Sequence, residues 1–356
     1  MTERGTGMPA SRANASAESR GVVLVDLALQ GGGSHGAYTW GVLDRLLEEP
    51  WLKIEAISGT SAGAMNGAVL VSGYMQGGAD GAKAALDGYW GRVADAARFS
   101  PIQRSPLDRL MKRWSLDTSP AYLLMDLMTR VVSPYSLNPF GVNPISDILE
   151  KSIDFAHLGE ASIKLFITAT NVHTGRGRVF RNKDLTPDVL LASACLPTMF
   201  QAIEIDGEPY WDGGYVGNPT ITPLVRESEA MDVILVQINP HERIETPRTA
   251  TQILNRLNEI SFNSPLMKEL RMIALLRQAA DPGTGEGARW ARMLMHRIDT
   301  NKLAEFGASS KLNAEREFLS MLKEEGRRTA DAFLREHCDD LGRRSTANLD
   351  ALLAEV

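Results

Sequence analysis

Two serines, each flanked by glycines, are the first residues in this sequence that could do chemistry. Ser61 is the centre of Gly-Thr-Ser-Ala-Gly at 59–63, and Ser34 is the centre of Gly-Gly-Ser-His-Gly at 32–36. Each segment follows an apolar run and precedes a helix-like one. A strand that turns sharply into a helix exposes the side chain at the turn, and small flanking residues permit that turn. Both serines are therefore candidate nucleophiles for acyl transfer.

The glycines before Ser34 help to decide between the two serines. Gly31, Gly32 and Gly33 present consecutive backbone N–H groups at the start of a helix, where a developing carbonyl oxyanion can bind. If the N–H groups of these glycines donate to the oxyanion, Ser61 is the residue that attacks the carbonyl carbon. If Ser34 attacked instead, the nucleophile would lie beside its own donor loop and the turn at Ser61 would have no role. We therefore predict Ser61 as the nucleophile and Gly31 to Gly33 as the oxyanion hole. Ser34 is expected to be a helix N-cap.

A serine nucleophile needs a base within hydrogen-bond reach. Asp212 ends an apolar segment at Gly213-Gly214, and a flexible turn there could bring the carboxylate towards the edge of a sheet. Asp-Gly is also ordinary turn chemistry, so the position alone does not prove a catalytic role. The histidines at 157, 173 and 241 flank other strands, and a histidine base therefore stays open at this point.

The first glycine-rich segment also fits a different class of site. Gly31-x-Gly33-x-x-Gly36 matches the dinucleotide-binding fingerprint, which expects an acidic residue about 20 positions later at the end of the next strand. Glu55 lies inside that strand, and residues 58–61 occupy its end. A dinucleotide-binding protein is therefore one alternative. A catalytically silent protein that binds a lipid or a partner is the other.

The elements that must position these residues begin as a β-α-β-α unit. Residues 22–29 and 54–57 predict buried parallel strands, and residues 34–47 and 62–71 predict helices. Such a unit is right-handed, so both glycine-rich turns lie at the same carboxyl edge of the sheet. Further strands are predicted at 163–170 and 232–238, with a short pairing segment at 179–180 and a hairpin turn at Asp206-Gly207.

The remaining chain divides into a leader, a cap and a helical end. Residues 1–20 predict a disordered leader without a signal sequence, and 21–245 a catalytic domain. Residues 98–145 are rich in proline and predict an irregular helical cap. The C-terminal region, 246–356, is expected to hold helices at 249–278, 288–296 and 314–341 and no strand. We expect the core to include Met111, Leu123, Leu124, Met125, Leu127 and Met128 of the cap, and Phe318, Leu322, Phe333, Leu334 and Leu341 of the C-terminal region.

Charge and composition exclude several classes of protein. A net charge of −6 in 356 residues argues against a general nucleic-acid partner, and two cysteines indicate a reduced compartment. We therefore predict a protein with no metal or organic cofactor that is cytoplasmic or, at most, peripheral to a membrane. Residues 98–113 carry five basic side chains and one acid, with Leu107, Leu110 and Met111 near helical spacing. This segment is either a membrane-interface helix or a packed cap helix.

Three motifs in order carry a resemblance to a known family. A glycine-rich loop after strand one, Gly-x-Ser-x-Gly after strand two, and Asp212-Gly213-Gly214 much later resemble the patatin-like phospholipases. The likeness extends from Leu24 to Pro240 and includes Asn138-Pro139 and the Ala-Ser-Ala-Cys-Leu-Pro segment at 192–197. It implies a Ser61–Asp212 dyad without a catalytic histidine and an oxyanion hole of Gly31, Gly32 and Gly33. One departure is His35, where the family often has Arg or Lys.

The resemblance also implies a fold and an activity. The fold would be a three-layer α/β/α arrangement around a mostly parallel sheet, related to the α/β hydrolases, with the helical C-terminal region added. The activity would be that of a serine carboxylic-ester hydrolase, a lipid acyl hydrolase of phospholipase A, lipase or esterase type. Its substrate would be a lipid or phospholipid. The glycines that complete the motifs are Gly36, Gly59, Gly63, Gly213 and Gly214.

Overall fold

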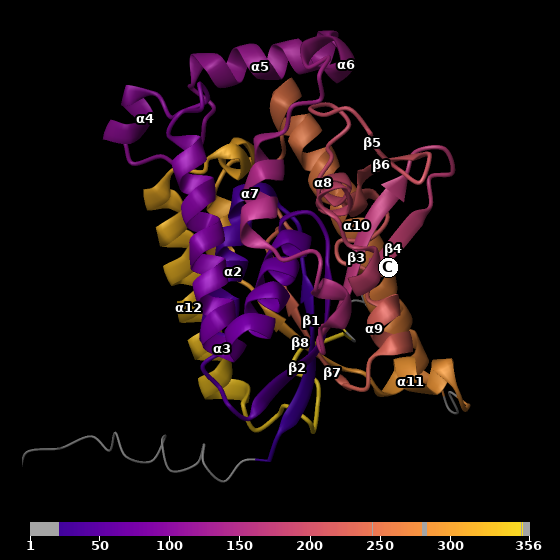
Figure 1. The fold of residues 1–356 in the computed structure, drawn as a ribbon. Helices are drawn as coiled ribbons and strands as arrows, with labels where there is room; N and C mark the ends of the chain where they lie inside the picture. Colours follow the sequence, from indigo (N-terminus) through magenta and orange to yellow (C-terminus); the bar gives the residue numbers. More distant parts are fainter. Residues whose placement is uncertain (1–20, 244, 280–282, 350, 352–356) are drawn as a thin grey trace, which may run out of the picture.

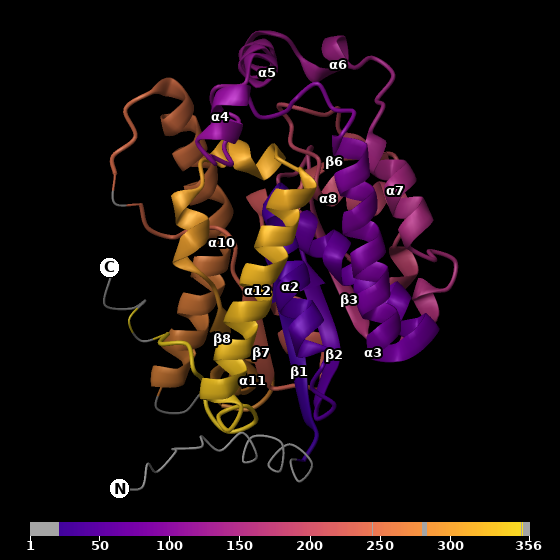
Figure 2. The same cartoon turned by 90° about the vertical axis from the view of Figure 1, so that its left-hand side faces the viewer.

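The fold is a central sheet covered by helices on both faces (Figures 1 and 2). The structure, a computed structural model, describes residues 21–243, 245–279, 283–349 and 351, so the predicted leader at 1–20 lies outside the described residues. The sheet has eight strands, with the order β5-β6-β3-β2-β1-β7-β8 and β4 paired to β3. The predicted α/β/α class with a mostly parallel sheet is confirmed.

The parallel part of the sheet is built from apolar strands that are buried on both faces. β1 (Val23–Leu29) lies between β2 (Leu52–Gly59) and β7 (Asp232–Val236), and β3 (Lys164–Asn171) continues the sheet beyond β2. The last five residues of β1 are fully buried, as expected for a central parallel strand. The predicted strands near these positions are confirmed.

One strand contradicts the expectation of a purely helical C-terminal region. The helix expected at 288–296 is instead a short helix, α11 (Glu286–Arg292), followed by β8 (Leu294–Ile298). β8 pairs in parallel with β7 along its whole length. A short apolar run fits a helix or a buried strand equally well by periodicity, and here pairing with β7 decides. The C-terminal region therefore extends the sheet.

An antiparallel group completes the sheet beside β3. β4 (Gly177–Arg181) pairs with one edge of β3, and the hairpin of β5 (Ile203–Ile205) and β6 (Glu208–Asp212) pairs with the other. Asp206 and Gly207 form the turn with φ angles of 55° and 78°. Two positive φ angles match a two-residue turn of type I′, so the predicted hairpin is confirmed.

Two helical layers enclose separate apolar clusters. One face of the sheet is covered by α2 (Gly36–Leu46), α3 (Ala62–Ala97), α7 (Pro144–Ser152), α8 (Pro187–Ser193) and α12 (Arg316–His337). The other face is covered by α9 (Thr222–Glu227), α10 (Ala250–Gln278) and α11. α3 is interrupted by non-helical residues at Gly77 and Gly78. The predicted C-terminal stripe is buried at Phe318, Leu322, Phe333, Leu334 and Leu341.

A cap of short helices lies at the end of the molecule where the parallel strands end (Figure 1). It consists of α4 (Pro106–Leu110), α5 (Pro120–Val131) and α6 (Pro134–Leu137), and residues 98–145 contain no strand, as predicted. The expected burial of its Met and Leu side chains is wrong, because Leu123, Leu124 and Leu127 are 51%, 61% and 58% exposed. Met111 and Met128 are also exposed, at 50% and 39%.

Short 3-10 helices connect these elements. They are η1 (Gly33–His35), η2 (Leu158–Glu160), η3 (Asn182–Asp184), η4 (Gly213–Tyr215), η5 (Asn301–Glu305) and η6 (Ala308–Leu312). Of these, η1 packs against η6, and η4 packs against β3. Within the part of the chain that the structure describes, no helix has the length and apolar character needed to cross a membrane.

Candidate active site

Ser61 lies at the turn from β2 into α3, with φ 54° and ψ −122°. This backbone region is almost confined to glycine, so a serine there is strained, and such strain gathers at functional sites. The two flanking glycines make room for the turn. A Cβ at Gly63 would lie 2.1 Å from the Leu29 carbonyl oxygen, and one at Gly59 would lie 2.7 Å from the Gly63 backbone. The predicted strand-turn-helix elbow is therefore present at Ser61.

Strand register brings Asp212 to the same level as Ser61. Gly59 of β2 pairs with Ile167 of β3, and Ala169, two residues further along β3, pairs with Asp212 of β6. Asp212 therefore lies level with a position two residues beyond Gly59, which is that of Ser61. The β5–β6 hairpin extends past the carboxyl edge and returns the chain to it. Residues far apart in the sequence meet in this way.

The Asp212 carboxylate is buried beside the serine, with only 4% of the residue exposed. Its Oδ1 accepts a 2.7 Å hydrogen bond from the Gly214 N–H. The turn after β6 brings this N–H back towards the carboxylate. Burial raises the pKa of Asp212 to about 7, against the opposing effects of the Gly214 N–H, the Ser61 side chain and the Lys311 charge. A carboxylate with a pKa near neutral pH is well matched to general-base work.

Buried polar side chains hold the elbow in place. The Ser61 N–H donates to Ser193 Oγ at 2.9 Å, and Ser193 Oγ donates to the Thr168 carbonyl at 2.7 Å. Thr60 Oγ1 donates to the Gly217 carbonyl at 2.7 Å on the other side. Ser193 belongs to the Ala-Ser-Ala-Cys-Leu-Pro segment that resembled the family, but its supporting role was not predicted. The strained turn is thus fixed from both neighbouring segments.

The glycine loop packs directly against the elbow, although its three glycines are not equivalent. A Cβ at Gly31 would lie 2.6 Å from the Ser61 Cβ, so glycine is required there. The Gly31 N–H donates to Asn218 Oδ1 at 2.6 Å, which differs from the donor role expected for it. No described residue accepts a hydrogen bond from the N–H of Gly32 or Gly33. The N–H groups of Gly32 and Gly33 therefore remain the candidate donors to an oxyanion.

The second serine motif has a different local structure from the one expected. Ser34 lies inside η1, and the residues that precede η1 and α2 are Gly32 and His35, neither with a side-chain cap. The predicted N-cap role of Ser34 is therefore wrong, because a 3-10 turn forms before α2 begins. Ser34 has an ordinary φ angle, whereas Ser61 has the strained one.

His35 is buried against the C-terminal region. Its Nε2 is hydrogen-bonded to Ser310 Oγ at 2.7 Å, and its ring contacts Phe306 and Phe318 edge to face. Burial, together with the charges of Lys311 and Arg243, lowers the pKa of His35 to about 3. The imidazole is therefore neutral at ordinary pH and brings no positive charge to the glycine loop.

Two of the three candidate histidine bases lie at the surface. His157 is 61% exposed and bonded to Asp154, and His173 is 64% exposed and bonded to Glu208. The backbone carbonyl of His241 accepts from Arg256 at 2.8 Å. Burial beside Ser61 distinguishes Asp212 from the two exposed histidines.

A network of amides at the ends of β1 and β7 was not predicted. Gln30 Oε1 accepts from the N–H groups of Ile238 and Asn239 at 3.0 and 2.9 Å, and Asn239 Nδ2 donates to the Gly31 carbonyl at 2.7 Å. The strand order changes direction at β1 and β7, which is where ligands bind in open α/β sheets. Single Gln and Asn residues carry no motif, so no sequence signal could have identified them.

Glu55 and Cys195 are both held by contacts away from the Ser61 elbow. Glu55, the candidate ribose ligand of the dinucleotide fingerprint, is bonded to Lys164 at 2.9 Å within the sheet. Cys195 is buried, as expected, and its Sγ is hydrogen-bonded to the Gln201 carbonyl at 3.0 Å. Among the described residues, no group of three His, Cys, Asp or Glu side chains is arranged to hold a metal ion.

Comparison with known proteins identifies the family of the chain. The family model of patatin-like phospholipases matches residues 27–225, more than half of the chain. The chain belongs to the patatin-like phospholipase family. The match includes the glycine loop, the Ser61 elbow and Asp212. The crystal structure of VipD from Legionella pneumophila resembles the chain with 15% identity and a TM-score of 0.42, covering 89% of this chain and 67% of that one. No curated protein matches the sequence significantly.

In this member of the patatin-like phospholipase family, residues beyond position 225 also reach the site. Phe262 of α10 lies 3.0 Å from the place that a Gly214 Cβ would take, and Asn263 accepts from Gln30 Nε2 at 3.3 Å. Lys311 of η6 reaches the amide network, since its Nζ donates to Asn239 Oδ1 at 2.8 Å. The region after the family match therefore helps to build the site.

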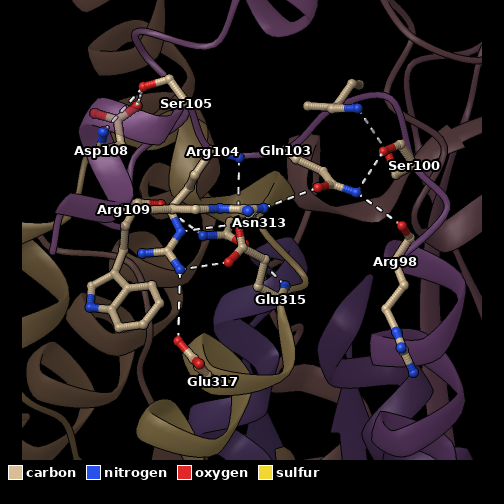
Figure 3. Close-up of polar contacts among 12 residues, drawn as sticks. Arg98, Ser100, Gln103, Arg104, Ser105, Asp108, Arg109, Asn313, Glu315 and Glu317 are labelled. Atoms are coloured by element: carbon tan, nitrogen blue, oxygen red, sulfur yellow. Dashed lines mark hydrogen bonds and ion pairs between the residues drawn. The ribbon is translucent and has the colours of Figure 1, made fainter.

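The cap is attached to the C-terminal region by a buried ion pair (Figure 3). Arg104 donates from Nε and Nη2 to Glu315 at 3.0 and 2.5 Å, and its guanidinium stacks over Trp114 at 4.1 Å. A pocket of about 910 Å³ lies beside this pair. Its basic lining consists of Arg98, Arg104, Arg109, Lys112 and Arg316, and its acidic lining of Glu315 and Glu317.

Proposed function

We propose that the chain is a lipid acyl hydrolase in which Ser61 is the nucleophile and Asp212 its base. The observation that carries this proposal is the strained Ser61 elbow, level with a buried carboxylate whose pKa burial raises to about 7. Family membership supports the hydrolysis of lipid esters. A nucleophile next to a base of suitable pKa is the arrangement that covalent catalysis requires.

The first half of the reaction forms an acyl-enzyme. The Ser61 hydroxyl oxygen attacks the ester carbonyl carbon and its proton passes to Asp212. The carbonyl oxygen becomes an oxyanion, which the N–H groups of Gly32 and Gly33 stabilise. When the tetrahedral intermediate collapses, the C–O bond to the alcohol breaks and Asp212 returns the proton to the leaving oxygen.

The second half regenerates the enzyme. A water molecule gives a proton to Asp212 while its oxygen attacks the acyl carbon, and the same donors stabilise the new oxyanion. The bond to the Ser61 oxygen then breaks, and the proton on Asp212 returns to that oxygen. The products are the alcohol and the carboxylic acid, and neither step needs a metal or an organic cofactor.

An exposed apolar surface around the site supports contact with a membrane. The cap lies at an end of the molecule to which α10 also extends (Figures 1 and 2). Both carry exposed apolar side chains. The exposed apolar residues of the cap and of the first turns of α10 are Leu107, Leu110, Met111, Leu123, Leu124, Leu127, Val131, Phe140, Ile253, Leu254 and Leu257. An apolar surface of this extent, beside the basic side chains that line the pocket, suits insertion into an anionic lipid interface.

Hydrolysis assays on the purified full chain test the proposal. We expect release of fatty acid from phospholipid vesicles and hydrolysis of a soluble short-chain p-nitrophenyl ester, with both activities absent from Ser61→Ala. A catalytically silent protein would bind vesicles without hydrolysing either substrate. Activity that survives in Ser61→Ala would assign the chemistry to another residue.

A further inference from the structure

Lys311 lies outside the family match, and its ammonium group contacts the amide network behind the glycine loop. Among the described residues, no other charged side chain beyond residue 225 is hydrogen-bonded to that network. Lys311 lies in η6, which packs on η1, and its backbone carbonyl is 2.4 Å from the place that a Gly33 Cβ would take. Its Nζ donates to Asn239 Oδ1 at 2.8 Å. The family motifs give no reason to expect a lysine here, since it comes from the far C-terminal part of the chain.

The contact of Lys311 extends to the glycine loop through one residue. Asn239 accepts from Lys311 with its Oδ1 and donates with its Nδ2 to the Gly31 carbonyl at 2.7 Å. The ammonium therefore fixes the orientation of the Asn239 amide, and the amide fixes the carbonyl at the start of the loop. Since the next two residues, Gly32 and Gly33, carry the unpartnered N–H groups, this chain of contacts sets the direction of the donors.

Lys311 is also the cation that acts on the base. Its charge lowers the pKa of Asp212, against the larger effect of burial. Burial lowers the pKa of the Lys311 ammonium itself, and Arg243 acts in the same direction, whereas the charges of Glu259 and Asp212 raise it. Glu259 of α10 is in turn bonded to Arg243 and Arg256. Tyr215 and Cys195 also lie close enough to Asp212 to interact with its charge. His35 is neutral and contributes none.

We propose that Lys311 is a positioning residue of the hydrolase, which orients the oxyanion donors through Asn239 and provides the positive charge that favours the ionised Asp212. This inference rests on the proposed function. It gives the C-terminal region a role in positioning a site whose motifs all lie in the first two thirds of the chain.

The pH dependence of Ser61 acylation tests this role. A general base must be ionised to act, so the rate rises with pH through the pKa of Asp212. Removing a nearby positive charge raises the pKa of a carboxylate, and we expect Lys311→Met to move the acid limb of the kcat/KM profile to a pH higher by about 0.5 to 1. We also expect kcat/KM on a soluble ester to fall by about tenfold to a hundredfold.

Two conservative variants separate charge from shape. Lys311→Arg keeps the charge and should restore the acid limb to the position found in the unaltered protein. Lys311→Gln keeps a hydrogen-bond donor without a charge, and should move the limb as Lys311→Met does. Lys302→Met is the matched control, because Lys302 lies in η5 of the same region and pairs with Glu325 instead. That control should leave the profile unchanged.

The outcomes distinguish this inference from the proposed function. Absence of hydrolysis and of Ser61 labelling in the unaltered protein would contradict the proposed function itself. An active protein whose acid limb is the same with Lys, Met and Gln at position 311 would overturn the inference alone. Failure of both Met and Gln variants to fold, with the Arg variant folded, would assign Lys311 a structural role and would contradict the inference equally.

Discussion

The backbone conformation of Ser61 has a measurable cost. Its φ of 54° and ψ of −122° belong to a region where a side chain is strained by about 1 to 3 kcal/mol. The bonds from Ser193 and Thr60 hold the turn despite this cost. The turn places the half-buried Ser61 side chain beside the buried Asp212 carboxylate.

Substitution of Ser61 tests this strain directly. Ser61→Gly and Ser61→Ala should both be inactive, because both lack the hydroxyl. Ser61→Gly should exceed Ser61→Ala in the free energy of unfolding by about 1 to 2 kcal/mol, since glycine accepts the backbone angles without strain. Urea unfolding followed by circular dichroism measures the difference. Equal stabilities of the two variants would show that the turn is not strained.

Asp212→Asn tests the base and its burial together. We expect the rate to fall by about two to four orders of magnitude, the range for a lost general base. The pKa of Asp212 is raised from 3.8 to about 7 in the folded chain, so the stability due to its protonated form is lost as the pH rises through about 7. Asp212→Asn should therefore raise the Tm more at alkaline pH than at acidic pH.

The histidines serve as controls for that variant. Alanine at His157, His173 or His241, introduced one at a time, should change the rate far less than Asp212→Asn does. A histidine variant as inactive as Asp212→Asn would replace the proposed dyad with a triad. The comparison needs only the soluble ester, so membrane binding does not enter it.

Much of this site could be predicted from local sequence, and the rest depends on long-range contacts. Ser61 and the surrounding glycines form a motif because the turn itself demands small residues. Asp212 could be proposed from its Gly-Gly turn, but only the β3–β6 register shows that it lies level with Ser61. Gln30, Asn239 and Lys311 meet through tertiary contacts alone. The predicted N-cap role of Ser34 is wrong because the preference of serine for helix starts does not distinguish an N-cap from a position inside a 3-10 turn.

In the helices of the cap, the apolar pattern predicts burial that the structure does not show. Its apolar positions recur at helical spacing, which normally indicates a stripe packed on the core. α4 and α5 instead expose these side chains, and only Tyr122 of α5 is buried. The basic segment 98–113 is not one helix, because α4 ends at Leu110 and Arg104 is held by Glu315. The exposed pattern favours the membrane-interface interpretation of this segment.

A charge variant of α4 and the residues after it tests that interpretation. Arg109, Lys112 and Arg113 are exposed, and replacing all three with Gln should weaken binding to anionic vesicles and lower activity on them. Binding by the unaltered protein should also weaken with added salt, because surface charges are screened over about 10 Å at 0.1 M. Hydrolysis of a soluble ester should hardly change. Vesicle sedimentation and the two assays give these quantities.

A matched variant controls for total charge. Arg335, Arg343 and Arg344 are exposed near the C-terminal end of α12, away from the cap, and their replacement with Gln removes the same charge. This control should bind vesicles as the unaltered protein does. Equal loss of vesicle binding in both triple variants would attribute the effect to net charge and leave the cap without a membrane role.

The C-terminal region is part of the core of the molecule. β8 extends the sheet beyond β7, and α12 packs against α2 where Gly41 and Gly326 allow close approach. A Cβ at Gly326 would lie 2.0 Å from the Tyr38 carbonyl oxygen. The predicted helical positions at 249–278 and 314–341 are confirmed by α10 and α12. The strand was missed because its five residues have no helical or alternating signature of their own.

Phe318 tests the unity of this core. Its side chain is fully buried against His35, Trp114 and Phe306, which belong to three different parts of the chain. Phe318→Ala should lower the free energy of unfolding by about 3 to 5 kcal/mol, whereas Leu275→Ala, at an exposed position of α10, should have little effect. Unfolding followed by tryptophan fluorescence and by circular dichroism should show one shared transition. Two separate transitions would indicate an independent C-terminal domain.

Active-site labelling shows directly whether Ser61 is the nucleophile of a hydrolase. A fluorophosphonate reacts covalently with an activated serine, and mass spectrometry of the digested protein identifies the modified residue. We predict one labelled peptide, carrying the adduct on Ser61, with labelling intact in Ser34→Ala and lost in Ser61→Ala. An adduct on Ser34 in the unaltered protein, or no adduct on any serine, would contradict the assignment of Ser61 as the nucleophile.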